Sequence, residues 1–155
     1  MKRIIASRML VVLFVAVLAV GTAQANGGHC STASVAGKWT FTTTGSVAGV
    51  GPVAAVGSYI ADSSGNLDGS QTRSLNGDVA FETFTGTSTV NSDCTGTDVI
   101  QVFQSGVLVR TSTLQVVYDD DGPKARAIFT SLVLPDGTSL PTILTIDAKH
   151  VVPRK

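Results

Sequence analysis

After residue 36 the chain consists of short segments in which apolar residues occupy every second position. A period of two places alternate side chains on opposite faces of a β-strand. Val and Thr, which favour strands, are abundant there, and turn-forming Asp, Asn, Ser and Gly residues separate the segments. The pattern predicts an all-β fold of about eight strands, over residues 37–44, 53–61, 67–75, 79–90, 97–104, 107–118, 124–134 and 140–150.

The connections between these segments are short, so consecutive strands are expected to pair antiparallel. Eight strands joined in simple order can close into an up-and-down barrel, which leaves no sheet edge exposed. We therefore predict a single antiparallel barrel. The alternative is a two-sheet β-sandwich, which needs a longer crossover between sheets. The Gly-containing stretch 46–52 is the segment that could supply one.

The alternation also predicts which side chains point inward. Arg110 shares its facing with Leu114, and a guanidinium inside a barrel needs an acid or a ligand anion as its partner, unless it reaches solvent at a strand end. Arg73 would need the same kind of partner if its side chain points inward. Glu82 follows the predicted inward Phe81 and is therefore expected on the outside. The residues predicted to contact a small ligand are Trp39, Tyr59, Phe81, Phe103, Arg110 and Tyr118.

Three later segments, 97–104, 124–134 and 140–150, carry apolar residues on both predicted faces. A strand that is apolar on both faces is typically buried on both. Because a barrel has a single interior, this pattern predicts that a second subunit covers the outer faces, giving a homo-oligomer. The alternative is that these are the scattered surface aliphatics common in soluble proteins.

The first 25 residues have the three parts of a secretory signal peptide. Basic residues precede an apolar run over 9–20, and Ala23-Gln24-Ala25 supplies the small residues of a cleavage site. The run is shorter than the roughly 20 residues of a spanning helix. We therefore predict a signal peptide over 1–25, an N-terminal segment over 26–36 and a barrel domain over 37–152, with a periplasmic or secreted location and no membrane span after cleavage.

Removing the leader takes away three basic residues, which leaves 8 basic against 11 acidic residues and a formal charge of −3. Nothing in the mature chain clusters Lys or Arg, so nucleic acid is not an expected partner. In an exported chain the two cysteines, Cys30 and Cys94, are expected to form a disulfide. The alternative, a redox or metal-binding thiol, lacks both a Cys-x-x-Cys motif and a nearby His.

Catalytic and metal-binding patterns are weak in this chain. A nucleophile needs a basic partner, but His29 and His150 lie near the two ends of the mature chain. Most carboxylates fall in predicted turns, and the oxygen-rich stretches 62–68 and 119–122 do not match the spacing of a calcium loop. We therefore predict no catalytic residues, no metal and no cofactor.

The Gly-x-Trp of Gly37-Lys38-Trp39 on the first predicted strand resembles the calycin group, which includes lipocalins and avidins. The resemblance implies a Trp that plugs one end of the barrel and a small apolar ligand that enters the other. Two features depart from the group: Trp39 is the single Trp, so biotin binding is not carried over, and no helix is expected after His150. Residues 85–97 also look like the Gly/Thr-rich hairpins of small exported bacterial barrels, including those called allene-oxide-cyclase-like, which implies fold alone.

These observations predict an exported, non-catalytic β-barrel that binds a small hydrophobic molecule in its interior. One alternative is a secreted protein-interaction or inhibitor module that acts through its outer apolar faces. Another is a cyclase- or isomerase-like enzyme that uses the barrel cavity, with Arg110 or Glu82 beside an aromatic ring.

Overall fold

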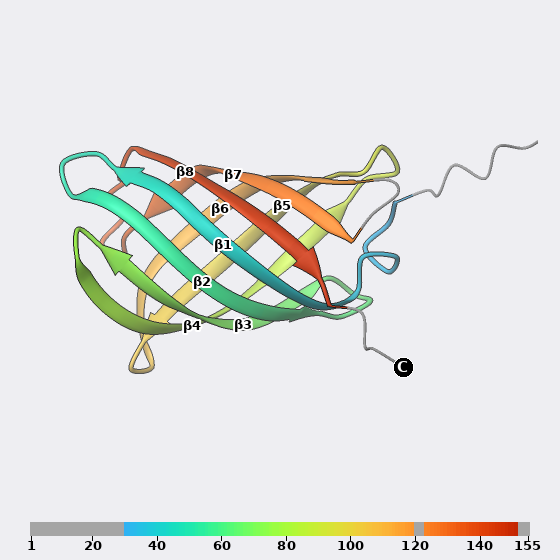
Figure 1. Cartoon of the computed structure of the whole chain (residues 1–155), viewed down its shortest axis with the longest axis horizontal. Helices are drawn as coiled ribbons and strands as arrows, with labels where there is room; N and C mark the ends of the chain where they lie inside the picture. The colour runs from blue at the N-terminus through green and yellow to red at the C-terminus, as the bar shows by residue number, and fades with distance from the viewer. Residues whose placement is uncertain (1–29, 120–122, 152–155) are drawn as a thin grey trace, which may run out of the picture.

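A computed structural model describes residues 30–119 and 123–151 as one closed antiparallel barrel (Figure 1). Its strands follow chain order, and β1 pairs with β8 to complete the closure. The predicted up-and-down barrel is confirmed, and the sandwich alternative is wrong. The strands are β1 (Gly37–Val47), β2 (Gly51–Ala61), β3 (Asn66–Leu75), β4 (Asp78–Val90), β5 (Thr95–Gln104), β6 (Val107–Tyr118), β7 (Lys124–Val133) and β8 (Thr142–His150).

The stretch 46–52 is not a crossover: its ends belong to β1 and β2, and residues 48–50 form a tight turn between them. The Val50 N–H donates to the Val47 carbonyl at 3.1 Å, and Gly49 takes a positive φ of 76° that glycine adopts without strain. A turn this short keeps β1 and β2 adjacent. Among the described residues no helix is long and apolar enough to cross a membrane.

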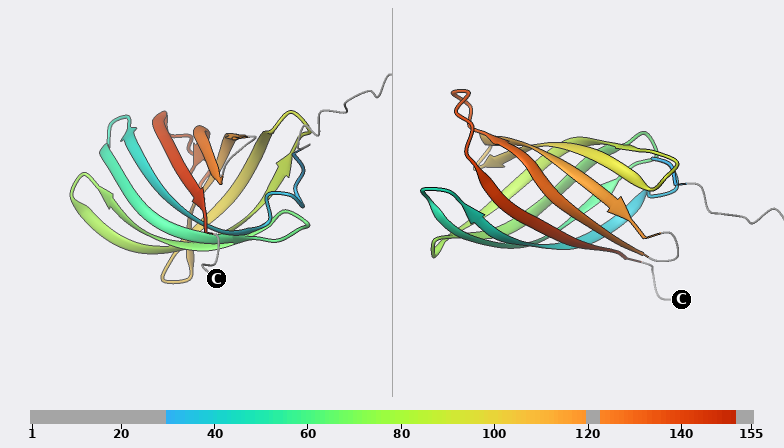
Figure 2. Two further views of the ribbon diagram at one scale, coloured as in Figure 1. Left: turned by 45° about the vertical axis from the view of Figure 1, so that its right-hand side comes forward. Right: turned by 90° about the horizontal axis from the view of Figure 1, so that it is seen from above.

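The two ends of the barrel differ (Figures 1 and 2). At one end, which we call the plugged end, residues 30–36 lie beside the turns β2–β3 and β4–β5. The predicted Cys30–Cys94 disulfide is present and fastens this segment to the β4–β5 turn, with a Cα–Cα distance of 4.9 Å. The other end, which we call the mouth, carries the turns β1–β2, β3–β4, β5–β6 and β7–β8. The disulfide is compatible with an oxidising compartment; the predicted signal peptide lies outside the described residues.

Aromatic rings fill the barrel at the plugged end. Trp39 stacks on Tyr59 at 6.3 Å and meets the edge of Tyr118 at 5.9 Å, while its indole N–H donates to the Val35 carbonyl at 3.0 Å. Trp39 therefore ties the N-terminal segment to the core. The resemblance to calycins implied a Trp in this position.

Two inward glycines make room for these rings. A Cβ on Gly57 would lie 2.7 Å from Cζ of Phe41, and one on Gly69 would lie 2.6 Å from Cζ of Phe84. The rings therefore rest against bare backbone on β2 and β3. This packing needs glycine for space, since neither residue has a positive φ.

The predicted facing of β4 is wrong. Phe81 is 64% exposed on the outer surface, whereas Glu82 is 1% exposed inside the barrel, between the inward Ala80 and Phe84. Alternation alone could not choose between the two faces, because each carries apolar residues. Phe103, also predicted inward, is opposite Thr83 and shares its outer face.

A β-bulge explains why β7 is apolar at both odd and even positions. Thr113 pairs with Ser131 and Leu114 with Phe129, so Thr130 has no partner on β6. The extra residue reverses the alternation, and Phe129 and Leu132 both line the interior. The two-faced pattern of β7 therefore does not require a second subunit, although Ile128 and Ile143 remain exposed outside. Self-association stays a prediction.

The facing of β4 can be tested by comparing two Phe→Ala variants on this strand. Phe84→Ala should lower the free energy of unfolding by about 3–5 kcal/mol, because it leaves a cavity in the aromatic core. Phe81→Ala should change it by no more than about 0.5 kcal/mol, because the ring is already in water. Urea denaturation of both variants measures the difference; equal losses would contradict this placement.

Candidate functional site

Four polar side chains cross the interior between the aromatic core and the mouth, and we call them the ionic layer. Gln71 and Arg73 come from β3, Glu82 from β4 and Arg110 from β6. Strand register explains their meeting: Gln71 is directly opposite Glu82, and Arg73 is opposite the inward Ala80 two residues away. Side chains on one face of neighbouring strands lie within reach of one another.

Glu82 is the centre of this layer. Arg110 binds it with both ends of the guanidinium, Nη1 to Oε1 at 2.8 Å and Nη2 to Oε2 at 2.7 Å. Arg73 Nε donates to Oε1 at 2.9 Å, and Gln71 Nε2 donates to Oε2 at 2.7 Å. Each carboxylate oxygen therefore accepts two hydrogen bonds. Bidentate, charge-assisted bonds of this kind hold all the partners in fixed positions.

These partners keep Glu82 ionised. Burial alone would raise the pKa of Glu82, but the hydrogen bonds and charge of Arg110, with the hydrogen bonds from Gln71 and Arg73, lower it to about 2. Two guanidiniums face one carboxylate, so the layer has an excess of one positive charge. Asp78 lies 3.9 Å from Arg73 Nη2 but is 83% exposed, where water and salt screen its charge.

A cavity of about 170 Å³ lies between the ionic layer and the mouth. Its floor is the layer itself. Its walls are mostly apolar and come from both halves of the barrel: Val47, Val50, Val53, Ala55, Leu75, Val109, Phe129, Leu132, Leu134, Leu140 and Leu144. An apolar chamber with a few convergent polar groups is the usual form of a small-molecule site.

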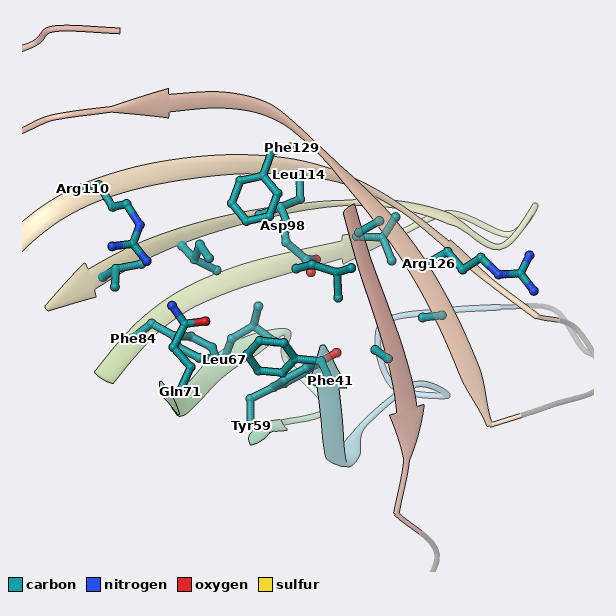
Figure 3. A pocket seen from close by; sticks show the side chains of 17 residues that line it. Phe41, Tyr59, Leu67, Gln71, Phe84, Asp98, Arg110, Leu114, Arg126 and Phe129 are labelled. Carbon is teal, nitrogen blue, oxygen red and sulfur yellow. The ribbon is translucent and has the colours of Figure 1, made fainter. Parts of the chain in front are cut away.

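A second, inner cavity of about 60 Å³ lies on the other side of the layer (Figure 3). Gln71 and Arg110 are at one end of it, and Phe41 and Tyr59 lie further in. At about 30 Å³ per molecule of liquid water, this volume suits one or two waters rather than an organic ligand.

Asp98 is the acidic residue that lines the inner cavity. Burial raises the pKa of Asp98, and the Ser88 hydroxyl partly offsets that effect. Burial, together with the nearby charge of Asp98, also raises the pKa of Tyr118 to about 12. Both effects favour neutral side chains in this part of the barrel.

The structure brings together some of the predicted ligand-contacting residues and separates others. Arg110 borders both cavities and Tyr59 borders the inner one. Trp39 and Tyr118 are buried at the plugged end and line neither cavity. Phe81 and Phe103, which face outward, line neither cavity. A ligand contact at any of these positions stays a prediction.

Arg73 and Glu82 were not among the predicted ligand-contacting residues, although Arg73 was considered as an inward guanidinium and Glu82 as part of the enzyme alternative. The available signal was the presence of two Arg residues at inward positions, which calls for an acid inside the barrel. Glu82 is an acid within a strand rather than in a turn. In the described part of the chain no three His, Cys, Asp or Glu residues gather as a metal site would require.

No protein-family model matches the chain, and no curated protein matches it. Among solved structures, the barrel is similar to an S-type phycobiliprotein lyase, CPES, from Guillardia theta. The sequences are 8% identical, the match covers 77% of this chain and 89% of the lyase, and the TM-score is 0.42. A likeness this distant carries no conclusion about family, ligand or activity.

The ionic layer predicts a specific dependence of stability on pH. Because the pKa of folded Glu82 is about 2, below its usual 4.5, its contribution is fully present above about pH 4.5 and is lost as pH falls towards 2. Glu82→Gln should remove this component of the pH dependence. At pH 7 it should cost about 3–5 kcal/mol, because two buried guanidiniums lose their counter-ion.

Urea unfolding between pH 7 and 2 measures both effects. Asp136→Asn, which changes a fully exposed turn carboxylate, is the control and should have a much smaller effect at pH 7. Parallel stability curves for wild type and Glu82→Gln would show that the layer does not contribute in this way.

Proposed function

We propose that this protein is an exported, non-catalytic barrel that binds a small molecule with an apolar body at its mouth. The observation that carries the proposal is the mouth cavity, in which apolar walls surround a fixed, charged floor. Hydrophobic walls supply affinity for an apolar body, and a rigid polar group fixes the orientation of the ligand. The predicted signal peptide and the disulfide support export.

The volume of the cavity limits the size of the ligand. Sites for drug-sized molecules usually measure about 300–1,000 Å³, whereas this cavity measures about 170 Å³. An apolar cavity of about 150 Å³ is known to hold benzene. We therefore propose that the buried part of the ligand is about the size of one ring, with any larger part projecting beyond the mouth.

The chain also offers a route into the cavity. Continuous pairing between β7 and β8 ends at Ile128 and Thr145. It resumes next to the turn, where Val133 bridges Ser139, so the ladder is interrupted between these two points. Leu134 and Leu140, which flank the β7–β8 turn, line the cavity beyond that point. Entry through this interruption would not require the paired part of the ladder to break.

A binding role fits the chemistry of the layer better than a catalytic one. A general acid or base works best with a pKa near the working pH, but the pKa of Glu82 is about 2 and both its oxygens accept hydrogen bonds. The described residues that line the mouth include no His, Ser or Cys. These features support binding over the cyclase- or isomerase-like alternative.

Benzyl alcohol, a neutral single-ring probe, tests the proposal by NMR titration of the full exported chain. We expect saturable shifts at residues around the mouth. Leu144→Phe places extra volume in the cavity and should weaken binding at least about tenfold, or about 1.4 kcal/mol. Ile143→Phe is the matched control, because Ile143 is 74% exposed on the outer face and its substitution should leave affinity unchanged.

Thermal unfolding shows whether both variants are folded before they are compared. Absence of binding by wild type, or equal binding by Leu144→Phe and wild type, would overturn the proposal.

A further inference from the structure

The floor of the mouth cavity has more positive charge than the fold neutralises. Arg73 and Arg110 both border the cavity, and Glu82 is the one carboxylate between them. The next acid, Asp78, is outside in water at the limit of ion-pair distance from Arg73. An excess buried charge is costly unless a partner of opposite sign comes to it.

The two guanidiniums differ in how they are used. Arg110 directs two of its N–H groups at the two oxygens of Glu82. Arg73 binds Glu82 through Nε alone. Its Nη1 is buried and has no hydrogen-bond partner among the described residues, although the whole residue is only 9% exposed. A buried charged donor without an acceptor is rare in folded proteins.

The protein cannot easily supply the missing acceptor from its own cavity. Both Glu82 oxygens already accept two hydrogen bonds each. The neighbouring walls are mostly aliphatic, with Leu75, Leu132 and Leu144 among them, and the two polar wall residues, Thr43 and Gln104, make no hydrogen bond to Arg73 Nη1. The unpartnered donor belongs to a residue that lines the apolar space, so one molecule in that space could pair with the Arg73 guanidinium and fill the cavity once the guanidinium turns its Nη1 towards it.

We infer that the ligand of the mouth is a small organic monoanion, a carboxylate whose oxygen accepts a hydrogen bond from Arg73 Nη1 while its apolar body fills the cavity. This inference rests on the proposed function and adds the chemistry of the head group. A single negative charge matches the excess of one positive charge in the layer, whereas a dianion would exceed it. Charge-assisted hydrogen bonds are also stronger than bonds to a neutral acceptor.

Three probes of nearly one shape test the head group on the full exported chain: benzoate, benzamide and benzylamine. Calorimetric titration at pH 7 should show benzoate binding at least about tenfold more tightly than benzamide, which is about 1.4 kcal/mol. Benzylamine should bind more weakly than benzamide, because its positive ammonium group is repelled by the positive excess of the layer. The comparison needs no mutation, so it does not depend on whether a variant folds.

The outcomes separate this inference from the proposed function. If benzamide or benzylamine binds as tightly as benzoate, the inference about charge is overturned while binding at the mouth stands. If none of the three probes binds and benzyl alcohol does not bind either, the proposed function itself fails.

Arg73→Gln assigns the preference to one residue. It should reduce benzoate affinity at least about tenfold, to the level of benzamide, and change benzamide affinity less than about twofold. Lys38→Gln removes the same charge from an exposed position on the outer surface and should leave both affinities unchanged. A folded Arg73→Gln variant that keeps the preference for benzoate would overturn the assignment to Arg73.

Discussion

The buried carboxylate of Glu82 is the interaction on which the interior of this barrel depends. Removing a charge from water costs several kcal/mol, and Coulomb attraction repays the cost only when the geometry is good and every lone pair is used. Here four donors from three side chains meet both oxygens. The same bonds join β3, β4 and β6 across the barrel. A hydrophobic residue at position 82 could fill the space but could not hold two guanidiniums in place.

The ionic layer divides the barrel into two parts with different packing. Towards the plugged end, rings rest on the bare backbone of Gly57 and Gly69, and the space that remains is about 60 Å³. Towards the mouth, aliphatic side chains line a cavity of about 170 Å³. A core that is packed in one half and open in the other concentrates any capacity for binding at the mouth. Trp39 and the disulfide strengthen the closed end.

Alternation and turn residues predicted the strands and their order well, because both signals are local. The facing of β4 was not predictable in the same way. Phe81 and Glu82 differ by one position, and the choice between them depends on Arg73 and Arg110, which lie on other strands. A local pattern cannot reveal that a charge is satisfied by partners distant in sequence. Hydrophobicity alone favoured Phe81 as the inward residue, but Glu82 is the one that points inward.

The bulge in β7 is the second feature that the sequence pattern could not predict, and it affected the predicted facing of that strand. One unpaired residue, Thr130, reverses the alternation in mid-strand, so that residues of opposite parity reach the same interior. Read without the bulge, the pattern indicated burial on both faces and hence a covering subunit. The bulge places Phe129 and Leu132 in the wall of the mouth cavity. The feature that misled the sequence analysis therefore helps to build the candidate site.

The charge state of the interior supports the proposal of recognition over the alternative of proton transfer. A pKa of about 2 keeps Glu82 ionised at any ordinary pH, and guanidiniums stay protonated. Burial moves the pKa of Asp98 upwards, but that carboxyl faces the inner cavity, where an organic substrate does not fit. The charges that a ligand meets at the mouth are thus constant with pH. In the proposed function, a fixed positive excess under apolar walls would select ligands by charge and shape, as a binding protein requires.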